Sequence, residues 1–509
     1  MPIVESLVKP KIQLNLSDSN MTWLHGAGMA GLWMTLKQLE KIYPICTQRV
    51  GNLTWSLTPR SISLFWEGQD FIVLDWLLKQ SFQISDNGLI FLMGLNNPLD
   101  LQTQIVIHQG ITATFLQHNK FFKSAGTASS LITIDKIKFL VKYKKAAYYA
   151  NQHFAKHLCD NHGQFLKNPI GVKGWLYPGC VVRHYAFEKE TTFKEKPEYA
   201  LILLFAPMAC QYFALLSPIS PDETQYALII PKVLDLELYA QYYWQLENLS
   251  YKYFHASSIG DAGLKFLTYA NAGEMNQLNP VKQCQVILFG TADWSERQKT
   301  RIEIAIVELN EKIDYYYQIS RRYFADTGFF QYKNQNCLYI SFVRGMIADN
   351  LAKGFPWWSN FYIKIKNKNL LNQIFKEHKQ IYNMIQNSNF DFPSQKLFIL
   401  ACHEALRKRY AKIYSNTKEG DYAQIERENK RLVSQLGRCT NADNFRKFIA
   451  EFWGKAGQIS ILQEHWEELL PITTGATNWQ IARDLTFIAI ASYQKRKEPG
   501  LETSGKSES

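Results

Sequence analysis

Residues 25–34 read HGAGMAGLWM, and their three glycines match the G-x-G-x-x-G pattern of a dinucleotide-binding turn. That turn needs a buried strand leading into the first glycine and an acidic residue about 20 positions further on. Here the polar residues SDSN separate the glycines from the apolar segment KIQLNL, and the window RVGNLTWSL (49–57) contains no Asp or Glu. The residues after the glycines follow a helical pattern, with Leu32, Leu36 and Leu39 on one face. We therefore predict a helix whose small residues allow close backbone packing, and no cofactor site.

The composition is that of an ordinary globular protein with a basic surplus. The 509 residues are enough for two or three domains, and 46% of them are hydrophobic and 20% charged. The net charge of +12 is uneven, since residues 364–509 carry +7 and the much longer segment 1–363 carries +5. Such a surplus indicates a polyanionic partner. The eight cysteines form no C-x-x-C pair, which argues against a zinc ribbon and favours a reducing, cytoplasmic environment.

The most apolar run is YALILLFAPMACQYFALL, residues 199–216, which is nearly long enough to span a bilayer. Pro207 and Gln211 interrupt it, so we predict two buried strands around a Pro turn rather than a membrane span. The opening residues MPIVESLVKPKIQLNL lack the sustained apolar core of a signal peptide. Both observations favour a cytoplasmic protein with no membrane partner.

Strand and helix patterns are mixed over the first two-thirds of the chain, and helical periodicity takes over from about residue 367. The predicted fold class is α+β, with a mixed, largely antiparallel N-terminal α/β region followed by a C-terminal helical bundle of about five helices. The predicted domains are residues 1–366, residues 367–497 and a disordered tail over 498–509. Strand pairs are expected over 53–66 and 83–95, strands over 130–149 and near 224–232, 284–290 and 337–343, and helices over 71–82 and 295–324.

Residues typical of catalysis do not form a recognised motif. His153 and His157 are four positions apart with His162 nearby, but a zinc-protease motif needs Glu after its first His, and Phe154 stands there. Contacts with phosphate or within a buried polar network are the preferred interpretation of these histidines. The consecutive residues CHE (402–404) point in different directions on a helix and cannot form a relay. We predict no catalytic residue, no bound metal and no cofactor.

Basic and aromatic residues alternate in several segments, as they do in nucleic-acid-binding proteins. The clearest is KIKFLVKYKKAAYY (136–149), where lysines can neutralise phosphates while Phe139, Tyr143 and Tyr148 stack on bases. Each basic cluster alone is equally typical of a solvated face, but their joint occurrence with the net charge favours salt-sensitive backbone binding. The candidate DNA- or RNA-binding residues are Lys142, Lys144, Lys145, Arg183, Arg321, Arg322, Arg407, Lys408, Arg409, Lys412, Lys430, Arg431 and Arg438.

Five strings occur in a characteristic order along the first 215 residues. They are WLHGAGMAGLWMTLKQLEK (23–41), DWLLKQSFQISDNGLIFLMGL (75–95), TFLQHNK (114–120), GWLYPGCVVRH (174–184) and LLFAPMACQYF (203–213). Together they make the chain similar to the large subunit of type I CRISPR Cascade complexes, of the Myxococcus-type subgroup placed with types I-A and I-B.

The resemblance implies a non-catalytic subunit of a CRISPR-RNA-guided DNA surveillance complex in antiviral defence. Such a subunit recognises the protospacer-adjacent motif, contacts the 5′ handle of the guide and stabilises the R-loop. Its C-terminal helices resemble the small subunit, which lies along the displaced strand. The implied partners are CRISPR RNA, target double-stranded DNA and the backbone, handle-binding and repeat-processing subunits, with transposition adaptor proteins in complexes that guide transposons.

Two other classes of function stay open at this point. One is a stand-alone CRISPR-repeat RNA-binding or RNA-processing protein that uses the histidines of residues 153–162; cleavage of repeat RNA by the isolated chain would favour it. The other is a structural scaffold whose basic patches dock only protein.

Overall fold

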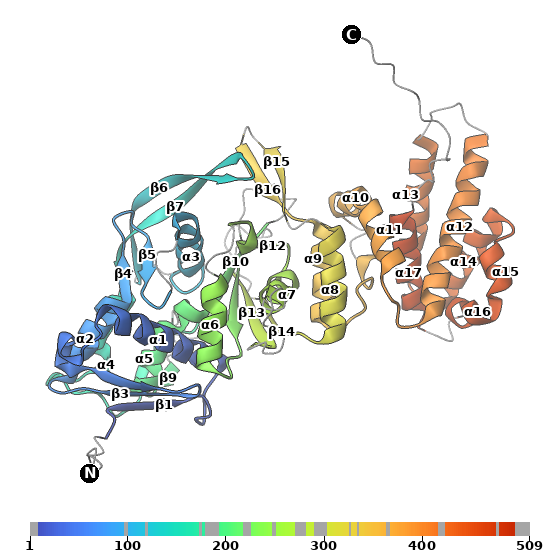
Figure 1. The fold of residues 1–509 in the computed structure, drawn as a ribbon. Helices are drawn as coiled ribbons and strands as arrows, with labels where there is room; N and C mark the ends of the chain where they lie inside the picture. The colour runs from blue at the N-terminus through green and yellow to red at the C-terminus, as the bar shows by residue number, and fades with distance from the viewer. Residues whose placement is uncertain are drawn as a thin grey trace, which may run out of the picture. The chain divides into compact units, whose positions relative to one another are not determined.

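The computed structural model describes residues 9–95, 100–117, 121–172, 176–178, 193–216, 225–246, 251–269, 281–289, 303–324, 327–332, 335–362, 367–415, 423–474 and 478–493. The chain forms two compact units. The N-terminal unit comprises Met1–Asp314 and Asp326–Ser341, and the C-terminal unit comprises Tyr315–Ala325 and Phe342–Ser509. Strands occur in the first and helices α10–α17 in the second, so the predicted α+β class is confirmed (Figure 1).

The glycines of residues 25–34 lie inside helix α1 (Trp23–Ile42), which begins after the capping residue Thr22. A Cβ atom added at Gly28 would lie 2.2 Å from the carbonyl oxygen of Ile202, and one at Gly31 would lie 2.1 Å from that of Phe205. Both carbonyls belong to helix α5 (Pro197–Ala209). Because no side chain fits between the two backbones there, the glycines allow direct helix contact, and the predicted packing role is confirmed.

Helix α5 corrects the prediction of two strands around a Pro turn. Residues 199–209 are buried on every face of this helix, Pro207 lies in its last turn, and only Gln211–Leu215 forms a strand, β10. A continuous apolar run cannot distinguish a buried helix from a buried strand by periodicity, which is why the prediction failed. No helix within the described ranges is long and apolar enough to cross a membrane.

Three antiparallel groups of strands form the first part of the N-terminal unit. A three-stranded sheet has the order β1 (Ile12–Asn15), β3 (Ser61–Phe65), β2 (Thr54–Leu57), and α2 (Asp70–Ser81) follows it. The strand pair predicted over 53–66 and the helix predicted over 71–82 are confirmed, and so is the pair predicted over 83–95. The two hairpins that follow are β4 (Phe82–Ile84) with β5 (Ile90–Leu92) and β6 (Phe122–Ile134) with β7 (Ile137–Tyr149), separated by α3 (Leu101–Ala113).

A five-stranded sheet forms the second part, in the order β12 (His255–Ala256), β10, β11 (Gln225–Pro231), β13 (Gln283–Phe289), β14 (Glu303–Glu308). Only the β10–β12 pair is parallel. Helices α6 (Leu236–Leu246) and α7 (Ile259–Tyr269) and the 3-10 helix η5 (Tyr251–Phe254) connect these strands. The remaining elements are η1 (Cys46–Gln48), η2 (Val50–Asn52), η3 (Ala150–His153), α4 (Ala155–Leu158), β8 (Ile170–Val172), β9 (Phe193–Glu195), β15 (Gly328–Tyr332) and β16 (Gln335–Tyr339).

The single helix predicted over 295–324 is wrong in its described first part. Residues 303–308 form β14, which pairs with β13, and helix α8 (Glu311–Tyr323) begins only afterwards. The β-branched residues of EIAIVE suit a strand as well as a helix face, and the neighbouring β13 decides between the two.

Helices build the C-terminal unit. The apolar side chains Phe445, Phe448, Ile449 and Phe452 recur at helical spacing and are all buried. The helices after α8 are α9 (Phe342–Ala352), α10 (Lys368–Lys376), α11 (His378–Asn387), α12 (Pro393–Ser415), α13 (Ala423–Gly437), α14 (Ala442–Ala456), α15 (Ser460–Glu464), α16 (Trp466–Thr474) and α17 (Trp479–Ser492). The tail predicted to be disordered lies outside the described residues.

Candidate nucleic-acid interface

The β6–β7 hairpin carries the lysine-rich segment singled out in the sequence. Its two-residue turn consists of Asp135 and Lys136, whose φ angles of 48° and 68° are those of a type I′ turn. Lys252 of η5 forms an ion pair with Asp135 and therefore fastens the tip of the hairpin to the unit. The tip of the hairpin is therefore fixed to the rest of the N-terminal unit.

The two faces of β7 separate its aromatic residues from its lysines. Phe139 and Tyr143 are buried, Phe139 against Phe329 at a ring distance of 5.4 Å and Tyr143 against His108 at 5.9 Å. The lysines at the alternate positions point to the opposite, exposed face. The prediction that these two aromatic rings stack on bases between the lysines is therefore wrong, because neighbouring residues on a strand face opposite ways.

The exposed side defines what we call the lysine face, formed by Lys138, Lys142 and Lys144. Directly opposite them in the register stand the small hydroxyl residues Thr133, Ser129 and Thr127 of β6. In the described part of the chain, no carboxylate forms an ion pair with these three lysines. Alternate residues on a strand are about 7 Å apart, so the face presents spaced cations to a polyanion. Lys138 lay in the quoted segment but was not selected as a candidate; strand alternation is the signal that selects it.

Lys145 does not join the lysine face. It lies at the register shift between the paired residues Lys144 and Ala146, is half-buried and packs its stem on the β4–β5 turn, where a Cβ at Gly88 would lie 2.7 Å from the Lys145 Cβ. Arg183 lies outside the described residues. Arg321 and Arg322 lie in the last turn of α8, in the C-terminal unit, where Arg321 is half-buried and Arg322 exposed.

The three histidines of the sequence pattern do not share one helix face. His153 ends η3 and stacks on Tyr148 at a ring distance of 5.5 Å, while His157 belongs to the separate short helix α4 and packs on Phe154. Among the residues that the structure describes, no group of three or more His, Cys, Asp or Glu side chains is placed to hold a metal ion.

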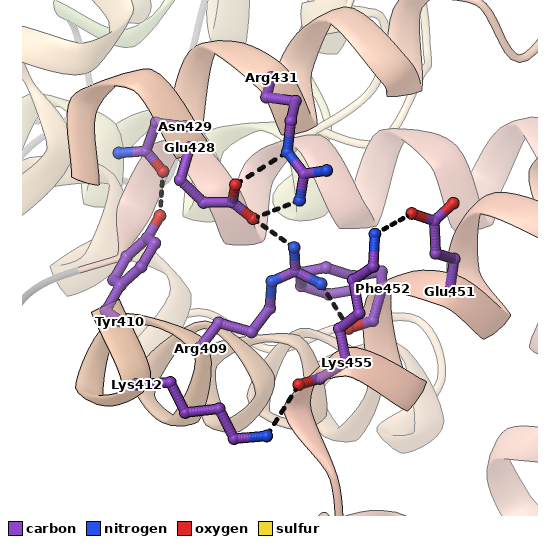
Figure 2. Close-up of polar contacts among 9 residues, drawn as sticks. All are labelled: Arg409, Tyr410, Lys412, Glu428, Asn429, Arg431, Glu451, Phe452 and Lys455. Carbon is purple, nitrogen blue, oxygen red and sulfur yellow. Dashed lines mark hydrogen bonds and ion pairs between the residues drawn. The ribbon is translucent and has the colours of Figure 1, made fainter. Parts of the chain in front are cut away.

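Arg409 belongs to the interior of the helical unit (Figure 2). Its side chain is only 5% exposed, forms an ion pair with Glu428 of α13 and donates a hydrogen bond of 3.1 Å to the carbonyl oxygen of Phe452 on α14. Arg431 donates two hydrogen bonds of 2.8 Å to the same carboxylate. Arg409 of α12 therefore links its helix to α13 and α14. Since Arg409 is occupied in this way, we leave it out of the proposed nucleic-acid contacts.

Lys408 and Lys412 of α12 lie beside the C-terminal end of α14. Lys412 donates a hydrogen bond of 3.1 Å to the carbonyl oxygen of Lys455, and Lys408 donates one to the carbonyl oxygen of Gln458 (Figure 2 shows the first). Cations at this end of a helix interact favourably with its free carbonyls. Lys408 also pairs with Glu404 at 3.1 Å, whereas Lys412 remains exposed. Both lysines thus have a structural role.

Glu404, the last residue of the CHE sequence, has a structural role. Its carboxylate accepts hydrogen bonds from the backbone of Ser460 and Ile461 and so caps α15. Burial favours a raised pKa for Glu404, but these hydrogen bonds and Lys408 outweigh it and hold the pKa below its usual value. The neighbouring Cys402 is fully buried, and burial raises the pKa of its thiol to about 12.

Helix α13 presents a stripe of arginines that the sequence analysis recognised only in part. Arg427 and Arg431 are exposed and lie one turn apart on one side of α13, and the exposed Arg438 follows directly after the helix ends at Gly437. Arg427 was missed, although the 3.6-residue period could have identified it. Lys430 is 68% exposed and pairs with Glu426 at 3.5 Å, and Arg407 of α12 is 58% exposed.

Comparison with known proteins places the chain among the CRISPR-associated proteins. The DevT N-terminal domain matches residues 13–204, and the DevT C-terminal domain matches residues 386–509. The chain is also similar to CRISPR-associated protein Cas8a1/Csx13 of Myxococcus xanthus (strain DK1622). The two sequences are 22% identical over an alignment of 519 residues, and this alignment covers 95% of this chain and 88% of that protein. The chain belongs to the DevT family and is a Cas8a1-like large subunit of Cascade complexes, which confirms the resemblance read from the five strings.

Proposed function

We propose that this chain is the non-catalytic large subunit that recognises the protospacer-adjacent motif, contacts the 5′ handle of the guide and stabilises the R-loop. The lysine face is the observation that carries the proposal. It combines three exposed cations that have no carboxylate partner among the described residues with a hairpin held in place by its neighbours. Membership of the DevT family supports the non-catalytic role, because large subunits of this kind are generally non-catalytic.

Guide pairing supplies the sequence information in such a complex, and the protein supplies contacts to phosphates and to a few base edges. The lysine face suits the phosphate contacts, since Lys142 and Lys144 are adjacent on one face of a strand and Lys138 lies two steps further along the same face. We propose that residues 1–366 hold this function, with CRISPR RNA, target double-stranded DNA and the other Cascade subunits as partners.

The exposed arginines of α13 suit a second polyanionic contact. We propose that residues 367–497 act as the counterpart of the small subunit and that Arg407, Lys412, Lys430 and the α13 arginines follow the displaced strand. Two hydrogen bonds to Glu428 occupy part of the Arg431 guanidinium. The side chain is 43% exposed, so we propose that the remaining part contacts the strand.

The motif-reading role is tested by co-expressing the chain with its neighbouring Cascade proteins and a repeat-spacer RNA. The purified complex is incubated with targets whose flanking bases are randomised. We expect one short flanking motif to be enriched and the enrichment to disappear when this chain is omitted. Equal enrichment without the chain would refute a motif-reading role. Adding transposition adaptor proteins to the same assay shows whether the complex directs transposition.

Changing Lys138, Lys142 and Lys144 together to alanine is expected to weaken DNA binding and to flatten its salt dependence. Each lost phosphate contact lowers the slope of log K against log salt by about 0.9, so the triple variant loses up to about 2.7. The slope is measured by titrating the assembled complex with duplex target at several salt concentrations.

The matched control is the triple alanine variant of Lys11, Lys37 and Lys79, which removes the same charge. Each of these lysines already pairs with a carboxylate, at 3.4, 3.1 and 2.7 Å respectively. An equal loss of slope in both variants would mean that net charge, and not the lysine face, drives binding.

A further inference from the structure

A pocket of about 270 Å³ opens beside the lysine face. Residues of β7, of β16 and of the C-terminal end of β10 line it. Lys142 contributes both to the pocket lining and to the lysine face. The residues that line the pocket include Tyr226 and Tyr251 and also Gln109 and Asn336. The lining thus combines flat aromatic surface with amide groups, next to a cation.

The free edge of β7 supplies a further pair of hydrogen-bonding groups. The carbonyl oxygens of Lys138 and Lys142 accept hydrogen bonds from Asn336 at 3.0 Å and from Gln109 at 2.9 Å, so both carbonyls point away from β6. Alternate residues of an antiparallel strand direct their peptide groups to the same edge. The N–H and C=O of Leu140, midway between them, therefore point to the same edge, where Leu140 lines the pocket.

We propose that this pocket binds one unstacked nucleobase of a single-stranded segment whose phosphates lie along the lysine face. The tyrosine rings stack on the base, the amides and the Leu140 peptide group hydrogen bond to its polar edge, and Lys142 neutralises the adjoining phosphate. This inference rests on the proposed function and adds to it a base-binding site within the N-terminal unit.

A nucleobase suits the pocket better than an inserted peptide strand does. The strand edge between Lys138 and Lys142 offers only one uncommitted residue, Leu140, because Asn336 and Gln109 occupy the carbonyls on either side. A peptide strand needs a row of such groups for its main-chain hydrogen bonds. The cations beside the pocket also match a phosphate better than a peptide.

The test uses the full chain and single-stranded RNA ten-mers from the CRISPR repeat, each with one abasic position, together with DNA ten-mers of the same sequence. For the wild-type chain, we expect one abasic position to weaken binding on the order of tenfold and the others much less. Leu338→Trp, at the pocket wall, is expected to weaken binding of the intact ten-mer to a similar degree and to abolish the effect of the abasic position. The two losses do not add, because both remove the same contact. The comparison of RNA with DNA identifies the strand that supplies the base.

Asn336→Ala serves as a milder variant, because this side chain is exposed and its removal leaves the core intact. It is expected to reduce the abasic effect partly, with an unchanged melting temperature. The triple lysine variant should bind every ten-mer more weakly and keep the abasic discrimination.

Four results would overturn the inference. If salt-dependent binding persists but no abasic position stands out, the lysine face is retained and the pocket is rejected. If the abasic effect survives in Leu338→Trp, the base lies elsewhere. If Leu338→Trp leaves RNA binding intact but blocks assembly with other Cascade subunits, the pocket receives protein. Failure of the wild-type chain to bind any ten-mer would reject the proposed phosphate contact together with the pocket.

Discussion

Gly28→Ala is expected to destabilise the N-terminal unit by about 3 kcal/mol, at the upper end of the usual cost of overpacking a core. The added Cβ would lie 2.2 Å from the carbonyl oxygen of Ile202, and a backbone atom of a buried helix cannot move aside as the end of a flexible side chain can. Helices α1 and α5 must therefore separate, and the cavity produced along their contact adds to the cost. Urea unfolding followed by circular dichroism measures the change.

Gly26→Ala is the matched control, since the same substitution falls two positions away in the same helix. Its Cβ would meet Leu16 at 3.8 Å and Val233 at 4.0 Å, which are ordinary contacts. Alanine is favoured over glycine in a helix by up to about 1 kcal/mol, so this variant is expected to be neutral or stabilised. Equal destabilisation by both variants would contradict the packing role and would mean that the glycines act as a set.

The packing of α1 could be predicted from sequence because its evidence is local. The glycine pattern lacks the preceding strand and the acidic residue of a dinucleotide-binding turn and is followed by a helical pattern. Closely spaced glycines in a helix then indicate close packing against another backbone. The identity of α5 could not be predicted in the same way. Its residues from Tyr199 to Ala209 are apolar at every position, so the choice between helix and strand depends on α1 and on the sheet beside it, which the sequence does not place.

The candidate site shows a similar division. Strand alternation could have separated Phe139 and Tyr143 from the lysines, because that period is visible in the segment itself. The burial of Arg409 is different, since three consecutive basic residues look alike until the partners Glu428 and Phe452 are known. The pocket beside β7 depends on residues from α3, β11 and β16, which no local pattern brings together.

Glu428→Gln is expected to destabilise the C-terminal unit by about 3 kcal/mol or more. The substitution leaves the Arg409 guanidinium, 5% exposed, without its countercharge, and the loss of one partner from a buried pair costs more than the pair itself contributes. The link from α12 to α13 runs through the Arg409–Glu428 pair and weakens with it, and Arg431 also loses its two-bond contact within α13 (Figure 2).

Glu426→Gln provides the control on the same helix. Glu426 and its partner Lys430 are 72% and 68% exposed at 3.5 Å, and an exposed pair of this kind contributes no more than about 0.5 kcal/mol. Both variants lose one negative charge, so a difference between them reports burial and geometry. Similar unfolding free energies for the two variants would show that Arg409 finds another partner or water.

The pH dependence separates the charge of Glu428 from its packing. Burial favours a raised pKa for this carboxyl, but hydrogen bonds from Arg431 and Arg409 outweigh it and hold the pKa below the usual value of 4.5. A lowered pKa in the folded state means that the charge stabilises the fold fully above pH 4.5 and that this contribution falls as the pH decreases through the folded-state pKa. The Gln variant lacks this titration, so the difference in unfolding free energy between wild type and Glu428→Gln should be largest near neutral pH and shrink below pH 4.5. A difference that stays constant down to pH 3 would assign the effect to shape instead of to the ion pair.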